Sequence, residues 1–294
     1  MAIKYPTAFT MLALSAAIIL ALLNGCAFKS IKRTKNIVYT GTNGDQTNGM
    51  QRLNVFAPSH KKDLKPVLIF VHGGNWNSGK KGLYSFFGSR LARKGIVAVL
   101  PGYPKSPEAD YATMAERIAA AVKWTKENIG RYGGDSSKIF ISGHSAGGHL
   151  AALVTQDPHY FNRLEIANPI KGVVLIDAAG LDMAGYMEEE NFPAGHTYLS
   201  TFTNDPASWK KASPIYFLQN KIPPLLIYRG GKTYPSIVKS NEKFKDSLQA
   251  RGANFKYILQ PKKKHIPMIL QFLNSYNKSY DEIISFMKKE SSPL

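Results

Sequence analysis

The sequence predicts an α/β fold, in which a mainly parallel central sheet is flanked by helices. From about residue 37, short apolar segments alternate with longer amphipathic segments. Several of the short segments, such as residues 67–71 (VLIFV), are apolar throughout. A strand that is apolar on both faces is typical of a parallel sheet covered by helices on both sides. Parallel strands also need crossover connections, usually helices, so the alternation itself favours this class.

The expected elements follow in the order that this class requires. Strands are expected at residues 37–40, 53–56, 67–71, 96–100, 138–142, 173–176, 225–228 and 255–259. Helices are expected at residues 83–94, 111–129, 146–154, 236–250 and 280–289. Each helix separates two strands or closes the chain, as crossover units require.

One segment, at about residues 182–216, interrupts the alternation after the sixth strand. We interpret it as a lid-like insertion over the carboxyl edge of the sheet, where ligands bind in such folds. Its methionines and aromatic residues either line an acyl or aryl pocket or form the core of the lid; they are Met183, Tyr186, Met187, Phe192, Tyr198 and Phe202.

Length and composition favour one large domain. The chain has 294 residues, of which 44% are hydrophobic and 20% charged, which is enough for a single core. The formal net charge of +18 favours anionic surfaces such as lipid head groups. No recognised nucleic-acid-binding module is present, so we expect no nucleic-acid partner. No cluster has metal-ligand spacing, and we expect neither a metal nor an organic cofactor.

The N-terminal segment, residues 1–25, has the features of an export signal. Lys4 precedes an apolar run at residues 8–23, which is shorter than the roughly twenty residues that span a bilayer as a helix. An uncleaved membrane anchor is the alternative. The mature catalytic domain is expected to comprise residues 26–294.

Cys26 is the only cysteine in the chain, so it has no disulfide partner within it. The preceding residues, Leu23-Asn24-Gly25, together with Cys26 resemble the bacterial lipobox. The resemblance implies that Cys26 is lipidated and becomes the mature N-terminus. It places the protein at the bacterial cell envelope, lipid-anchored on the periplasmic side at the outer membrane. An ordinary signal peptide that happens to contain a cysteine is the alternative.

A candidate nucleophile stands between an expected strand and an expected helix, in Gly143-His144-Ser145-Ala146-Gly147. A serine hydroxyl becomes nucleophilic when it is exposed beside a base and near donors for the developing oxyanion. A sharp strand-to-helix turn exposes it, and the flanking glycines relieve the crowding of that turn. The motif alone also fits an ordinary turn, but its context predicts that Ser145 is the nucleophile. The first amide of the helix, at Ala146, remains free to donate.

A second motif, His72-Gly73-Gly74-Asn75-Trp76, follows the expected strand at residues 67–71. Adjacent glycines let backbone amides approach a substrate oxygen closely. We therefore expect Gly73 and Gly74 to contribute the other part of an oxyanion hole, with Ala146. A glycine pair after a strand is otherwise only a turn.

The candidate base is chosen from seven histidines. Folds with this serine turn place the triad in the chain order serine, acid, histidine. Only His265 follows the last expected strand and directly precedes a helix. It is the predicted base, the alternative being a solvated histidine beside Lys264. We expect His149, four residues after the serine, to have a structural role.

The stretch from Val67 to Leu153 resembles the esterase/lipase branch of the α/β-hydrolases. That branch includes hormone-sensitive-lipase-like carboxylesterases and BD-FAE-type feruloyl esterases. The motifs that carry the resemblance are HGGNW, LPGYP at residues 100–104, AVKWTKENI, GGD at residues 133–135 and GHSAGGHLAAL. The resemblance covers the chain from about residue 50 to the C-terminus. It implies an α/β-hydrolase fold with Ser145 as nucleophile, His265 as base, and Gly73, Gly74 and Ala146 as oxyanion donors.

The acid departs from the family pattern. Many relatives carry an aspartate after the strand that is here residues 225–228, in an H-G-x-x-D pattern. This chain has Arg229-Gly230-Gly231-Lys232-Thr233, without a carboxylate. A triad needs an acid to hold the imidazole and stabilise its charge. Asp177, at the end of the preceding strand, is the predicted acid, and Asp182 is the alternative.

These residues together predict a serine carboxylic-ester hydrolase that acts through an acyl-enzyme on a small or medium acyl or aryl ester. Its expected partners are that small-molecule substrate and, through lipidated Cys26, a membrane surface. A peptidase, thioesterase or acyltransferase would use the same Ser–His pair. A catalytically silent binding protein that keeps the fold is the alternative of another class, and the missing acid is its only support.

Overall fold

The computed structural model describes residues 30–40, 51–59, 63–218 and 221–291. The signal segment and Cys26 lie outside these ranges, so what was inferred about them stays a prediction. Among the described residues, no helix is both long enough and apolar enough to cross a bilayer. Residues Ile31–Leu294 group into one unit by their contacts.

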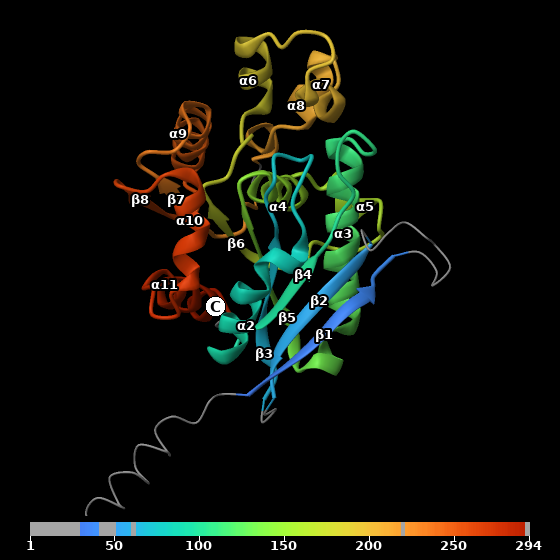
Figure 1. Ribbon diagram of the computed structural model, residues 1–294, viewed down its shortest axis with the longest axis vertical. Coiled ribbons are helices and arrows are strands. Elements are labelled where there is room, and N and C mark those ends of the chain that lie inside the picture. The colour runs from blue at the N-terminus through green and yellow to red at the C-terminus, as the bar shows by residue number, and fades with distance from the viewer. Residues whose placement is uncertain (1–29, 41–50, 60–62, 219–220, 292–294) are drawn as a thin grey trace, which may run out of the picture. The chain divides into compact units, whose positions relative to one another are not determined.

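An eight-stranded sheet organises this unit, with the order β1-β2-β4-β3-β5-β6-β7-β8 (Figure 1). The strands are β1 (Ile31–Val38), β2 (Arg52–Pro58), β3 (Lys65–Val71), β4 (Val97–Pro101), β5 (Gly134–His144), β6 (Ile170–Ile176), β7 (Leu225–Gly230) and β8 (Phe255–Gln260). The pairs β1–β2 and β2–β4 are antiparallel, whereas every pair from β4 to β8 is parallel. The predicted α/β class with a mainly parallel sheet is confirmed.

Helices connect the parallel strands. They are α2 (Ser85–Arg93), α3 (Tyr111–Asn128), α4 (Ala146–Gln156), α5 (His159–Asn162), α6 (Met183–Glu190), α7 (Thr197–Phe202), α8 (Pro206–Lys211), α9 (Pro235–Ala250), α10 (His265–Leu270) and α11 (Ser279–Lys289). Short 3₁₀ turns are η1 (Lys81–Tyr84), η2 (Ile129–Tyr132), η3 (Pro214–Phe217) and η4 (Gln271–Leu273). The longest helix, α3, begins where the Asp110 side chain accepts a hydrogen bond from the Thr113 amide at 2.8 Å, which satisfies an otherwise unpaired donor of the first turn.

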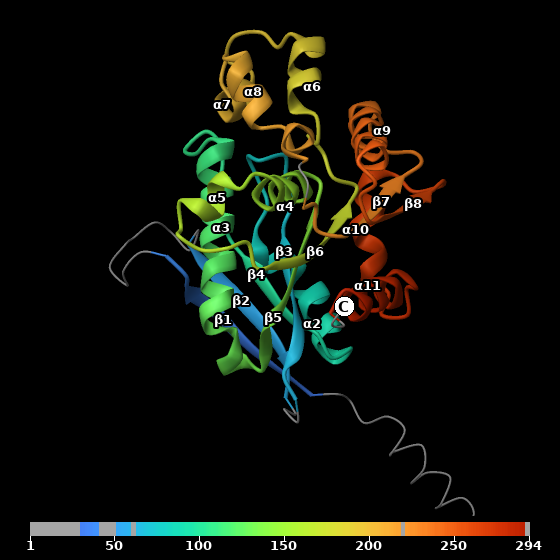
Figure 2. The ribbon, with the colours of Figure 1, turned by 180° about the vertical axis from the view of Figure 1, so that it is seen from behind.

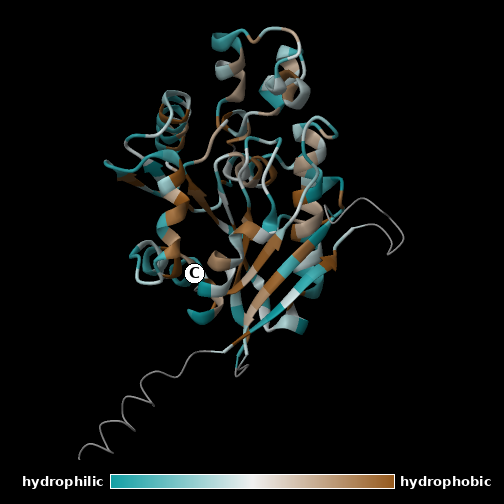
Figure 3. Ribbon diagram, in the orientation of Figure 1, coloured by the Kyte–Doolittle hydropathy of each residue, from teal (hydrophilic) through white to brown (hydrophobic). Residues whose placement is uncertain are grey.

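The two faces of the sheet form two separate cores, because successive side chains of a strand point to opposite faces. In β3, Val67, Ile69 and Val71 pack in the core under α3, α4 and α9. Leu68 and Phe70 pack in the other core, under α2, α10 and α11. Figures 1 and 2 show these two helical layers from opposite sides. The apolar central strands appear brown in Figure 3.

The first strand differs from its prediction. We expected residues 37–40, whereas β1 spans Ile31–Val38. Its charged residues Lys32, Arg33 and Lys35 are exposed, because β1 lies at the edge of the sheet and pairs only with β2. An edge strand with little buried surface carries no apolar pattern, so its extent could not be read from hydrophobicity.

The insertion expected after the sixth strand consists of α6, α7 and α8, which lie between β6 and β7 in the chain. Figures 1 and 2 show these three helices grouped beyond α4. Its methionines and aromatic residues divide into two groups. Met183, Met187 and Phe202 are buried and form its core. Tyr186, Phe192 and Tyr198 are half-buried and pack against one another.

We expect Phe87→Ala to lower the free energy of unfolding by about 3–5 kcal/mol, the usual cost of emptying a buried phenylalanine site. Phe87 is fully buried and contacts the rings of Phe70, Phe272 and Tyr280. Urea denaturation followed by circular dichroism measures the loss. The matched control is Phe86→Ala, whose half-buried ring predicts a clearly smaller loss. Equal losses would contradict the assignment of Phe87 to the core.

Candidate active site

Ser145 occupies the sharp turn between β5 and α4. Its backbone has φ 54° and ψ −125°, a conformation that is costly for a residue with a side chain. Two glycines make the turn sterically possible. A Cβ at Gly143 would lie 2.2 Å from the carbonyl oxygen of Gly147, and one at Gly147 would lie 2.2 Å from that of Val71. The close approach of β3, β5 and α4 therefore requires glycine at both positions and leaves the Ser145 side chain at the carboxyl edge of the sheet.

His265 reaches Ser145 from the other side of that edge. It is the first residue of α10, after β8, and its Nε2 lies 2.9 Å from Ser145 Oγ. Its other ring nitrogen, Nδ1, lies 2.6 Å from Asp177 Oδ2. Nδ1 therefore donates to the carboxylate, and Nε2 accepts from the serine hydroxyl. This chain of two hydrogen bonds is the arrangement that removes a proton from a serine during nucleophilic attack.

Asp177 is fully buried at the end of β6. Its Oδ1 accepts a hydrogen bond from the Gly230 amide at 2.8 Å. Its Oδ2 accepts one from the Thr233 hydroxyl at 2.5 Å, in addition to that from His265. Each oxygen thus has a partner, as a buried carboxylate requires.

Asp182, the alternative acid, serves a different purpose. It precedes α6 and accepts a hydrogen bond from the Gly185 amide at 3.1 Å. Its other oxygen lies 2.6 Å from Lys243 Nζ. These contacts assign Asp182 to the N-cap of α6 and to an ion pair with α9, so the structure brings Asp177, and not Asp182, to His265.

Thr233 is a site residue that sequence reasoning passed over. It stands at the position of the aspartate in the H-G-x-x-D pattern, after β7. In this chain its hydroxyl donates to the carboxylate of Asp177. A carboxylate at the end of the neighbouring strand, Asp177, thus lies beside His265, and the residue at the usual acid position donates a hydrogen bond to it. The sequence position of Thr233 could have indicated this contact, because a hydroxyl at the usual acid position still reaches the carboxylate beside His265.

The loop after β3 brings the glycine pair beside the nucleophile. A Cβ at Gly73 would lie 3.2 Å from Ser145 Cβ. Gly74 has φ +135°, a conformation that side chains rarely adopt. The amide of Ala146, the first residue of α4, has no partner within the helix. The structure therefore places both Gly73 and Ala146 next to Ser145, and Gly74 follows Gly73 in the loop.

Tyr84, on η1, is a second residue that the sequence did not indicate. Burial raises the pKa of its hydroxyl, and a hydrogen bond with the backbone of Gly73 acts in the opposite direction. Its ring stacks on His72 with the ring centres 6.2 Å apart. The Tyr84 side chain is thus part of the wall around the glycine pair.

Three further histidines are held neutral near the site. Burial lowers the pKa of His72 to about 4 and that of His149 to about 4. Burial, followed by the proximity of His265, lowers the pKa of His144 to about 3. The His144 ring stacks on that of His265 with the ring centres 4.7 Å apart. With pKa values this low, none of these three imidazoles readily accepts a proton at neutral pH. His265 is the histidine whose Nε2 contacts Ser145 Oγ.

His149 has a structural role, as expected. It connects the loop that carries Gly73 and Gly74 to the insertion. The Trp76 indole donates to its Nδ1 at 3.1 Å, and its Nε2 donates to the carbonyl of Ala212 at 2.6 Å. The Trp76 ring also contacts the rings of Tyr198 and Phe202 in α7. The insertion is therefore packed directly against the loop that carries Gly73 and Gly74.

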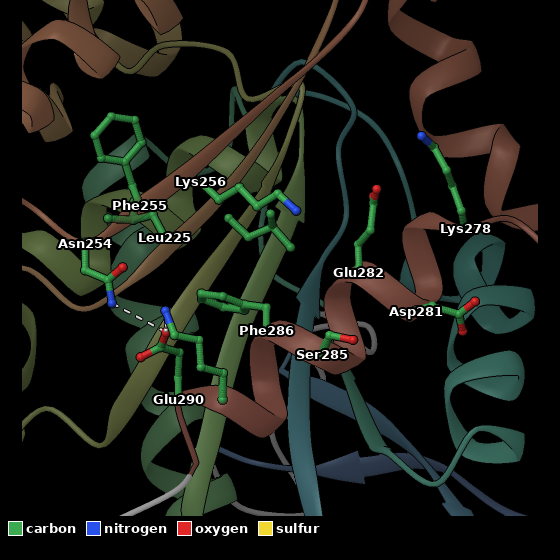
Figure 4. Close-up of a pocket in the computed structure, with 12 residues that line it drawn as sticks. Leu225, Asn254, Phe255, Lys256, Lys278, Asp281, Glu282, Ser285, Phe286 and Glu290 are labelled. Carbon is green, nitrogen blue, oxygen red and sulfur yellow. Dashed lines mark hydrogen bonds and ion pairs between the residues drawn. The ribbon is translucent and has the colours of Figure 1, made fainter. Parts of the chain in front are cut away.

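A cavity of about 530 Å³ lies elsewhere, between α11 and the first residues of β7 and β8 (Figure 4). Leu225 and Phe255 line it at the amino ends of these strands. The triad side chains stand at the carboxyl ends of parallel strands, so this cavity is at the opposite edge of the sheet.

Within the described part of the chain, no group of three or more His, Cys, Asp or Glu side chains is placed to hold a metal ion.

Comparison with known proteins gives a family match. The model of the BD-FAE family matches residues 53–247. The chain is 28% identical over 280 residues to the isoprenylcysteine alpha-carbonyl methylesterase ICME of Arabidopsis thaliana, covering 90% of this chain and 64% of that protein. It is 32% identical over 201 residues to esterase LipQ of Mycobacterium tuberculosis, covering 64% of this chain and 47% of that protein. The chain thus spans less than two thirds of the length of these curated relatives.

A solved structure supports the fold. Esterase B of Lactobacillus rhamnosis, inhibited by a tributyrin phosphonate, superposes with a TM-score of 0.75 at 18% identity, covering 97% of each chain. At this identity the likeness concerns the fold alone. The chain has the α/β-hydrolase fold.

We expect substitution of Asp177 and substitution of Asp182 to have different effects on the reactivity of Ser145. Asp177→Asn removes the charge that stabilises the imidazolium, so we expect labelling of Ser145 by a fluorophosphonate to slow by on the order of 10³–10⁴-fold. Asp182→Asn is the matched control, and its labelling rate should stay within a few-fold of the parent. Time courses followed by intact mass spectrometry measure both rates. A large loss in Asp182→Asn with Asp177→Asn unaffected would reverse the assignment.

Proposed function

The chain belongs to the BD-FAE family, and on that premise we propose that it is a serine carboxylic-ester hydrolase that acts through an acyl-enzyme. The observation that carries this proposal is the hydrogen-bonded chain from Ser145 Oγ through His265 to Asp177. The named esterases among its sequence relatives support the same reaction class.

In the first half of the reaction, Ser145 Oγ attacks the acyl carbonyl carbon while His265 Nε2 takes the hydroxyl proton. The negative charge passes to the carbonyl oxygen, where we expect the amides of Gly73, Gly74 and Ala146 to donate. Asp177 stabilises the imidazolium that has formed. His265 then protonates the departing alcohol, and the acyl group remains on Ser145.

The second half repeats these steps with water. His265 takes a proton from a water molecule, whose oxygen attacks the acyl carbon. The same amides hold the oxyanion, and the proton returns to Ser145 Oγ as the carboxylic acid leaves. No step needs a group from outside the chain other than substrate and water.

We propose a small or medium acyl or aryl ester as the substrate. The half-buried aromatic residues Tyr186, Phe192 and Tyr198 lie on the insertion, and the Tyr198 hydroxyl donates to Asn75 Oδ1 at 3.0 Å, next to the glycine pair. They supply apolar surface for a short acyl or aryl group. Esterase B, with its tributyrin phosphonate, is a structural neighbour that takes a short-chain ester analogue.

The alternative of a silent binding protein rested on the missing acid after β7. Asp177 occupies the place of that acid beside His265, so the observation that favoured this alternative no longer does so. A peptidase, thioesterase or acyltransferase would use the same pair, and a comparison of ester, amide and thioester substrates separates these from an esterase.

We further propose that the protein is a bacterial lipoprotein, with residues 1–25 as its signal peptide and Cys26 as its lipidated first residue. The basic start, the short apolar run and the single cysteine support this proposal. It places the catalytic domain at the cell envelope, on the periplasmic side at the outer membrane.

Ser145→Ala is expected to leave a folded protein whose ester turnover falls by several orders of magnitude. The measurement is a panel of nitrophenyl esters from acetate to palmitate, with maximal turnover expected for the shorter acyl chains. The matched control is Ser142→Ala, in the same strand, whose buried hydroxyl has no hydrogen-bond partner in the described structure. This control should retain most of the activity. Unchanged turnover in Ser145→Ala would refute the proposed function.

The lipid anchor is tested separately from catalysis. Cells fed a labelled fatty acid should incorporate the label into this protein, and Cys26→Ala should abolish incorporation, because the chain has no other cysteine. Fractionation of the envelope provides the second readout. Unlabelled parent protein in the soluble periplasmic fraction would refute the lipoprotein proposal and leave the enzyme proposal intact.

A further inference from the structure

Four large apolar side chains are exposed along α10 and the segment that follows it. The exposed fractions are 52% for Ile266, 46% for Leu270, 47% for Leu273 and 92% for Tyr276. We call these four residues the α10 patch. The first three are spaced by four and then three residues, so they lie along one side of α10 and η4.

The opposite side of the same segment packs against the rest of the protein. Met268, Ile269 and Phe272 are buried in the core that α10 shares with α2 and α11. The segment is therefore apolar on both sides, although only one side has a partner. Figure 3 shows α10 brown on the flank of the sheet. Exposed apolar residues gathered in this way mark an interaction site more often than scattered ones do.

Cationic side chains stand at both ends of the α10 patch. Lys262, Lys263 and Lys264 directly precede α10, and Lys278 follows Tyr276 by two residues. None of these four lysines makes an ion pair with another described residue. Of the nearby acids, Asp281 pairs with Lys94 at 3.4 Å, and Glu282 accepts from the Tyr228 hydroxyl at 2.9 Å. The lysines are thus available to an anionic partner.

We propose that the α10 patch docks the protein on a lipid surface that carries anionic head groups. An apolar stripe with lysines at its ends is the pattern by which a protein lies on a bilayer, with the apolar side chains at the acyl boundary and the cations among the head groups. The net charge of +18 acts in the same direction over a longer range. This contact is separate from a lipid anchor at Cys26.

One end of the α10 patch lies beside the catalytic histidine. His265 is the first residue of α10 and directly precedes Ile266. Tyr234, which is 58% exposed, packs its ring 5.1 Å from that of His265. The docking proposal is based on the α10 patch and its lysines and does not depend on ester hydrolysis.

The test uses the full chain. Because the chain has a single cysteine, replacing it allows a fluorophore to be attached at one chosen position. In a Cys26→Ala background, Tyr276→Cys is labelled with an environment-sensitive fluorophore and mixed with phosphatidylglycerol-rich vesicles. We expect a blue shift and a several-fold rise in emission. The matched control is Leu64→Cys, which is 57% exposed and directly precedes β3, outside the α10 patch. Its emission should change little.

Vesicle composition and a second variant complete the test. Vesicles of phosphatidylcholine alone should give a much smaller shift at position 276, and Leu270→Ser with Leu273→Ser should remove the shift on anionic vesicles. Turnover of soluble nitrophenyl butyrate by that double variant shows that it is folded, and it is expected to match the parent. No shift at 276, an equal shift at 64, or equal shifts on both kinds of vesicle would overturn the proposal.

Discussion

The buried carboxylate of Asp177 holds three parts of the structure together. It accepts hydrogen bonds from His265 Nδ1, from the amide of Gly230 at the end of β7 and from the Thr233 hydroxyl. Its own amide donates to the carbonyl of Tyr228 at 2.7 Å. A fully buried carboxylate is stable only when its oxygens are satisfied. The ends of β6 and β7 and the start of α10 must therefore keep their relative positions for the Asp177 carboxylate to keep these hydrogen bonds, and the same positions present His265 to Ser145.

The other half of the site depends on close packing rather than on charge. Half-buried Ser145 stands in a sharp turn where β3, β5 and α4 approach so closely that Gly143 and Gly147 admit no side chain. The same approach places Gly73 against Ser145. The insertion adds a third constraint, since His149 and Trp76 connect it to the glycine loop. The insertion and the loop with the proposed oxyanion donors are thus joined by direct contacts.

Local patterns were sufficient to predict much of this arrangement. The strand, the G-x-S-x-G turn and the helix around Ser145 are adjacent in the chain, and continuous apolar runs indicated the buried strands. His265 followed from its place after the last strand. The acid was undecided because its partners are distant: Asp177 and His265 are 88 positions apart, and only the folded sheet shows which carboxylate meets the imidazole.

Other features were missed because they leave no local pattern. β1 is a polar edge strand, so hydrophobicity showed only its last residues. Thr233 has no distinguishing property until its hydroxyl is seen on Asp177, and Tyr84 enters the site through a contact with Gly73. Exposure of the α10 patch is likewise a property of the folded chain, since the sequence does not show which apolar residues of this segment face the core.

The bond between His265 and Asp177 can be observed directly by proton NMR. A proton shared between an imidazole Nδ1 and a buried carboxylate resonates far downfield of the ordinary amide region. The account predicts such a resonance in the parent protein, its retention in Asp182→Asn, and its loss in both Asp177→Asn and His265→Ala. A downfield resonance that persists in Asp177→Asn, or that disappears in Asp182→Asn, would contradict the assignment of Asp177 as the acid on which the site depends.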